Sequence, residues 1–172
     1  MKKIVLAFLI MSAFLMGCKD KNEYESSIYE GENLTIAVIG EKPEVREKNI
    51  QFRSITLEEL ESNMTGIDAI FITKERLEQA AKPEYVKLYH QIKMPVFFIE
   101  SEKSYIPFIY EDIAYEDAPN INDQMYVAGM MSDGTDEVQV WGFGLYNDVV
   151  NETNIKSAYS DIFETIASLG KE

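Results

Sequence analysis

The sequence predicts an α/β fold: a three-layer sandwich with a mostly parallel central sheet, completed by a C-terminal antiparallel hairpin plus helix. Three observations predict it. Short apolar, β-branched runs alternate with helical segments between residues 34 and 100, two later apolar runs flank an Asp-Gly turn, and an amphipathic pattern occupies 151–170. Strands that alternate with helices favour a parallel sheet with helices packed against it.

Four expected strands follow from their apolar patterns. Residues 34–39 form a continuous apolar run that ends at Gly40, and 66–73 and 94–100 are nearly continuous in apolar residues. Such runs are typical of strands that are buried on both faces. Residues 49–55 alternate apolar and polar side chains instead, which predicts a half-exposed strand.

The helices between these strands are predicted from capping signals and from proline. Thr56 and Glu59 have the spacing of a capping box, which predicts a short helix over 56–63. Residues 74–81 have a helical composition, and Pro83 follows soon after. Because proline suits the first turn of a helix and disrupts its interior, we expect one helix to end near residue 81 and another to begin at Pro83.

The C-terminal part predicts a hairpin and a long helix. Apolar runs at 124–131 and 138–146 flank Asp133-Gly134, a dipeptide that favours a tight turn between antiparallel strands. The final helix, 151–170, carries its apolar residues on one stripe: Ile155, Ala158, Tyr159, Ile162, Ile166 and Leu169. This stripe predicts packing against the sheet.

The N-terminus has the features of a secretory signal peptide. Lys2 and Lys3 precede an apolar stretch over 4–17, which is shorter than the roughly 20 residues of a membrane span. The tetrapeptide LMGC at 15–18 resembles the lipobox of bacterial lipoproteins, and Cys18 is the single cysteine of the chain. The resemblance implies that the Cys18 thiol is diacylated and that the chain is cut just before it.

This resemblance divides the chain into three parts. Residues 1–17 are expected to be the signal peptide, 18–32 a lipidated flexible tether, and 33–172 a single α/β domain, as the length of 172 residues suggests. The predicted location is the cell membrane, with the lipid as anchor and the domain on the extracytoplasmic side. A single cysteine excludes a disulfide within the chain.

The formal net charge of −14 limits the partners. Binding to a phosphate backbone needs clustered Lys and Arg, so the charge argues against nucleic acid and against peripheral docking on anionic lipid. An acidic surface attracts cations or basic partners, or serves solubility alone.

The candidate ligand site lies beyond the carboxyl ends of the strands, where open α/β sheets bind their ligands. The candidate residues there follow the first, third and fourth strands: Glu41, Lys42, Thr73, Lys74, Glu100 and Ser101. Charges of both signs predict a small polar or zwitterionic ligand. The alternative is that these are ordinary solvated strand ends.

Residues 101–124 form a long irregular segment, which is often functional inside a compact domain. Its Tyr105 and Tyr110 are candidates for binding a ligand or a protein partner, because tyrosine is common in binding hot spots. Trp141 and Phe143 share one face of the last strand. They either extend this aromatic surface or fill the core against the final helix.

No cofactor is predicted, since the chain lacks glycine-rich phosphate loops, and no serine lies in a nucleophile elbow. No metal site is predicted either, because the segment that begins at Asp133 has Val138 and Gly144 where a calcium loop needs Gly and Glu. The only histidine, His90, is expected to be exposed on a helix. The sequence therefore favours a non-catalytic binding or interaction module. The alternative is a cation-assisted carboxylate hydrolase, with Glu100 and Glu102 as acid and base.

Overall fold

A mixed six-stranded sheet organises the protein. The computed structural model describes residues 22–62, 64–120, 125–135 and 137–170. The strands are β1 (Leu34–Ile39), β2 (Ile50–Ser54), β3 (Ala69–Ile72), β4 (Val96–Ile99), β5 (Val127–Ser132) and β6 (Val138–Phe143). Their order across the sheet is β2-β1-β3-β4-β5-β6. The α/β class is confirmed.

The pairing changes direction at β4. β1 pairs in parallel with β2 and β3, and β3 pairs in parallel with β4. β5 is antiparallel to β4, and β6 is antiparallel to β5, as predicted for the hairpin. β3 and β4 are buried along their whole length, in agreement with their continuous apolar runs.

The helical segments are short, with one exception. They are η1 (Glu58–Glu61), η2 (Lys74–Arg76), α1 (Leu77–Ala80), α2 (Pro83–Tyr89), α3 (Ile106–Ile109), η3 (Tyr146–Asp148) and α4 (Glu152–Leu169). Pro83 lies in the first turn of α2, as predicted. The helix expected at 56–63 is only the 3-10 turn η1, where Glu59 Oε2 accepts from the Thr56 amide at 2.7 Å.

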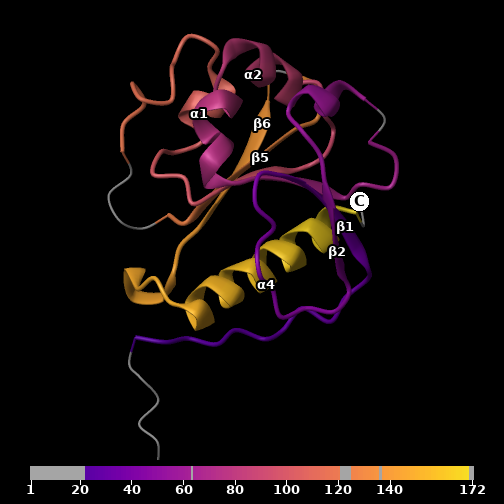
Figure 1. Ribbon diagram of the computed structural model, residues 1–172, viewed down its shortest axis with the longest axis vertical. Coiled ribbons are helices and arrows are strands. Elements are labelled where there is room, and N and C mark those ends of the chain that lie inside the picture. Colours follow the sequence, from indigo (N-terminus) through magenta and orange to yellow (C-terminus); the bar gives the residue numbers. More distant parts are fainter. Residues whose placement is uncertain (1–21, 63, 121–124, 136, 171–172) are drawn as a thin grey trace, which may run out of the picture.

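Each face of the sheet has its own apolar core. α4 covers one face, where Phe71 lies parallel to Phe163 with ring centroids 6.2 Å apart (Figure 1). Segments around α1, α2 and α3 cover the other face, where Phe98 stacks on Phe108. Neighbouring residues of one strand reach opposite cores because side chains alternate along a strand.

The flexible tether predicted over 18–32 is described only from residue 22, and this part contacts the domain. Residues 22–32, here called the N-terminal strap, run along α4 (Figure 1). The Ser26 amide donates to Ser157 Oγ at 3.0 Å, and the Tyr29 side chain is buried against Phe163. The strap is polar in sequence and mostly exposed, but its Tyr24 and Ser26 amides bind side chains of α4.

The predicted signal peptide and Cys18 lie outside the described residues. No helix in the described part of the chain is both long and apolar enough to cross a membrane.

Candidate functional site

The carboxyl ends of β1 and β3 meet at the centre of one edge of the sheet. β1 lies between β2 and β3, so the chain leaves β1 toward one side and later adds β3 on the other. Such a reversal of strand order opens a crevice between the two strand ends. The structure therefore brings together the loops that begin at Gly40 and Thr73.

Thr73 joins these two loops. Its hydroxyl oxygen accepts from the Glu41 amide at 3.0 Å and donates to Glu75 Oε2 at 2.8 Å. Gly40 has φ of +113°, and a Cβ there would come within 2.0 Å of Thr73 Oγ1. Glycine is required at this position both for its backbone conformation and for the close approach. Thr73, a predicted ligand-binding residue, is buried and does not line the cavity beside this junction, and its hydroxyl holds the neighbouring Glu41 and Glu75.

Beside this junction lies a cavity of about 490 Å³, here called the edge cavity. It is lined by Ile39, Gly40, Glu41, Ile55, Thr56, Leu57, Glu58, Glu75, Arg76 and Gln79. The lining combines apolar residues with three carboxylates, a guanidinium and an amide. Such a mixed lining suits a small ligand that carries charge.

Two of the carboxylates are held in the ionised form. The backbone amide of Glu75 and the Thr73 hydroxyl lower the pKa of Glu75. The pKa of Glu58 is lowered by its own backbone amide and by hydrogen bonding at Thr56. Hydrogen bonds to a carboxylate favour its charged form. Negative charge is therefore fixed next to Arg76.

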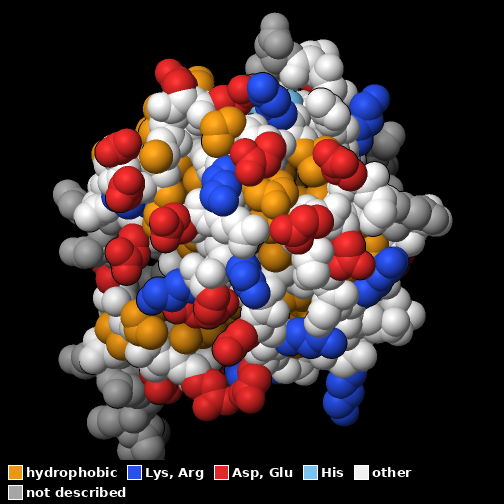
Figure 2. All heavy atoms as spheres, turned by 45° about the horizontal axis from the view of Figure 1, so that its top comes forward, with side chains coloured by type: hydrophobic (Ala, Val, Ile, Leu, Met, Phe, Trp, Pro, Cys, Tyr) orange, Lys and Arg blue, Asp and Glu red, His pale blue; other side chains and the backbone are white. Residues whose placement is uncertain are grey.

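The other predicted site residues are spread over the same edge. Glu41 lines the edge cavity, whereas Lys42 is exposed and does not line it. Lys74 and Glu100 line a second hollow of about 290 Å³, together with Glu102. Figure 2 shows one face of the molecule, on which acidic side chains are scattered among basic and hydrophobic ones.

Three further predicted residues, like Lys42 and Thr73, line neither hollow. Ser101 is buried and closes a turn, since its hydroxyl donates to the Lys103 carbonyl at 2.7 Å. Tyr105 packs half-buried on the core beneath α3, and Tyr110 is exposed. The structure thus gives Ser101 and Tyr105 structural roles.

Glu100 has an unusual backbone. Its φ of +56° is rare for a residue with a side chain. Its carboxylate accepts from the Tyr126 hydroxyl at 3.3 Å. Burial and the nearby Glu100 charge raise the pKa of Tyr126, so its hydroxyl stays protonated and donates the hydrogen bond. Among the described residues, no group of three or more His, Cys, Asp or Glu is placed to hold a metal ion.

The packing of His90 and of the two aromatic residues on β6 can be compared with the predictions made for them. His90 is half-buried, not exposed, and its Nε2 lies 2.9 Å from the Ile109 carbonyl. Since a carbonyl only accepts, Nε2 carries the proton. Trp141 and Phe143 pack against the core on the α4 side, so the core-filling alternative is correct for both.

Of the charged and amide side chains that line the edge cavity, those of Glu58, Glu75, Arg76 and Gln79 were not among the predicted ligand-binding residues. Glu75 and Arg76 directly follow two selected residues, Thr73 and Lys74. The feature that could have indicated them is their position just after a strand. Which of the four consecutive polar side chains faces the cavity depends on the 3-10 turn η2.

No protein-family model matches the chain, and no curated protein or solved structure matches it either. The function must therefore be inferred from the chemistry of the site.

Thr73→Val should lower the free energy of unfolding by about 1–3 kcal/mol, because the Glu41 amide and the Glu75 carboxylate lose a buried partner. Thr73→Ser is the control. It keeps the hydroxyl and should cost only about the 0.8 kcal/mol of one methyl group. Urea unfolding measures both variants, and equal losses would contradict the positioning role of the hydroxyl.

Proposed function

We propose that the chain is a lipid-anchored binding module on the extracytoplasmic side of a bacterial cell membrane. Its domain is a three-layer sandwich with a mostly parallel central sheet, and it takes a small cationic or zwitterionic ligand in the edge cavity. One observation carries the ligand proposal: ionised carboxylates and a guanidinium line a cavity where the strand order reverses.

The anchoring proposal is supported by the sequence of the leader. A positive n-region, a short apolar stretch and the LMGC motif at 15–18 end at the single cysteine of the chain. Each methylene buried in a bilayer contributes about 0.8 kcal/mol, so two acyl chains anchor a protein stably where one does not. A leader of this type directs export, which places the domain outside the cytoplasm.

The charges that line the edge cavity support the ligand class. Glu58 and Glu75 offer ionised carboxylates to an ammonium group, and Glu41 lines the same cavity. Arg76 offers a planar guanidinium that can bind a carboxylate in a bidentate manner. A cavity of about 490 Å³ accommodates a ligand of the size of an amino acid. A protein partner that inserts a basic side chain would satisfy the same groups.

A ligand screen tests this proposal. The melting temperature of residues 18–172 should rise with amino acids or amines and not with nucleotides, sugars or metal ions. A ligand that binds only the folded state at 100 times its Kd stabilises it by about 2.7 kcal/mol. The shift should be constant down to about pH 5, because the pKa of Glu75 is lowered from 4.5 and its carboxylate stays charged there.

Variants locate the binding site. Glu75→Gln should remove the shift, because it keeps the shape and the hydrogen bond from Thr73 but loses the charge. Glu102→Gln, in the second hollow, should leave the shift unchanged. The absence of any shift, or a shift that survives Glu75→Gln, would contradict ligand binding in the edge cavity.

The anchor has its own test. Cys18→Ala should abolish labelling with radioactive palmitate in the producing bacterium and leave the uncleaved precursor, because the acylated thiol is lost. Ser12→Ala, within the apolar stretch, should be labelled and cleaved normally. Labelling that persists in Cys18→Ala would contradict lipidation at this residue.

A further inference from the structure

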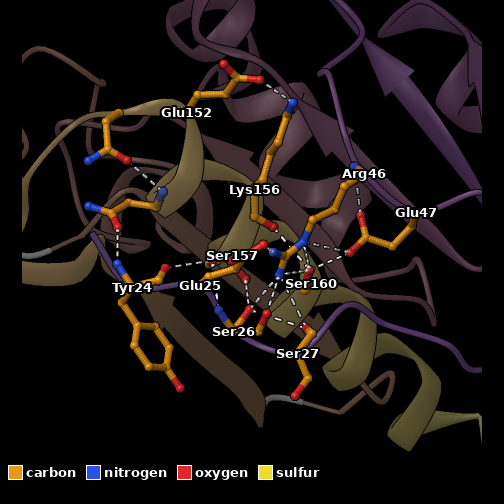
Figure 3. Close-up of polar contacts among 12 residues, drawn as sticks. Tyr24, Glu25, Ser26, Ser27, Arg46, Glu47, Glu152, Lys156, Ser157 and Ser160 are labelled. Atoms are coloured by element: carbon orange, nitrogen blue, oxygen red, sulfur yellow. Dashed lines mark hydrogen bonds and ion pairs between the residues drawn. The ribbon is translucent and has the colours of Figure 1, made fainter. Parts of the chain in front are cut away.

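The N-terminal strap is fixed to the domain by a buried polar network (Figure 3). Arg46 Nη2 donates to the carbonyl and hydroxyl oxygens of Ser26 and to Ser160 Oγ, each at 2.9 Å. Glu47, whose side chain is fully buried, lies 3.7 Å from Arg46 Nε and accepts from Ser160 Oγ. The network therefore joins the strap, the loop after β1 and α4.

Asn154 fixes the beginning of the strap. This residue is buried, and its Oδ1 accepts from the Tyr24 amide at 2.9 Å. Its Nδ2 donates to the carbonyls of Asn22 and Val149, also at 2.9 Å each. The start of the strap is thus bound to the N-terminal turn of α4, which also holds the segment just before α4.

Exposed apolar side chains gather around this point. Tyr24 is 54% exposed, Tyr146 44% and Val150 73%. The rings of Tyr24 and Tyr146 lie 5.6 Å apart, and Figure 3 shows the Tyr24 ring pointing away from the network. Val150 follows Val149, which Asn154 holds. We call Tyr24, Tyr146 and Val150 the tyrosine patch.

The length of chain between the strap and Cys18 identifies what the patch meets. Three residues lie between Cys18 and Asn22, so the two Cα atoms are four peptide units apart and can be separated by at most about 14 Å. An anchor at Cys18 would therefore hold the start of the strap close to the lipid head groups. Tyrosine combines an apolar ring with a polar hydroxyl and is enriched at this depth of a bilayer.

From this geometry we propose that the tyrosine patch docks on the membrane interface and sets the orientation of the domain. The inference rests on the proposed lipid anchor at Cys18. The strap acts as a rigid connector, so the lipid fixes which face of the domain meets the bilayer. Asp148 and Glu152 flank the patch and favour a zwitterionic lipid surface over an anionic one.

Hydroxyl-radical footprinting tests this proposal on residues 18–172, which contain the complete strap and domain. A synthetic diacyl lipid is coupled to the Cys18 thiol, the only thiol of the chain, and the protein is bound to phosphatidylcholine vesicles. The unlipidated chain with the same vesicles is the reference. Because the lipid is supplied chemically, the result does not depend on whether the bacterium acylates Cys18.

Oxidation of Tyr24 and Tyr146 should fall at least about threefold in the lipidated protein, since interfacial side chains lose contact with water. Tyr110 is the matched control. Its exposed fraction of 53% is similar to the 54% of Tyr24. Tyr110 follows α3 on the other face of the sheet, so its oxidation should not change. Unchanged oxidation of Tyr24 and Tyr146, or equal protection of Tyr110, would overturn the proposal.

Discussion

The attachment of the N-terminal strap to the domain depends on the contacts of the Arg46 guanidinium. The guanidinium bridges a strap carbonyl, a strap hydroxyl and a helix hydroxyl, and it compensates the buried charge of Glu47. Removing one partner of a buried ion pair typically costs about 3–5 kcal/mol, because the remaining charge is left without compensation. Among the described residues, no buried side-chain nitrogen or oxygen lacks a hydrogen-bond partner. The strap is thus an integral part of the fold.

The loop after β1 contributes residues both to the edge cavity and to the network that holds the strap. It begins with Gly40 and Glu41, which Thr73 holds at the edge cavity. A few residues later it supplies Arg46 and Glu47 to the strap. The edge cavity and the attachment of the strap therefore share one short piece of backbone. The close contact between Gly40 and Thr73 fixes that backbone at its start, and the ion pair fixes it at its end.

Sequence alone was sufficient for the elements whose formation depends on local pattern. The apolar runs gave β1, β3 and β4, the Asp-Gly turn indicated the hairpin, and Pro83 marked the start of α2. These predictions succeed because burial and proline geometry act over a few residues. The α4 stripe also packs as expected, through Tyr159, Ile162 and Ile166.

The strap and the site depend on contacts that no local pattern reveals. Ser26 and Ser157 are 131 residues apart in sequence, and their hydrogen bond leaves no periodic trace. A polar segment with one buried tyrosine, Tyr29, has the composition of a linker. At the edge of the sheet, the inward turn of the Thr73 hydroxyl decides which charges face the cavity. Strand-end position indicated the region but not the side chains.

Amide hydrogen exchange of Tyr24 and Ser26 is the most direct test of the central claim, that the strap is bound to α4 and not a flexible tether. Their N–H groups donate to Asn154 Oδ1 and Ser157 Oγ. Bound amides exchange only when the structure opens locally. Both amides should exchange far more slowly than in an unfolded peptide, and Arg46→Met should accelerate the exchange of both together. Exchange of both amides at the unfolded rate in the natural chain would contradict it.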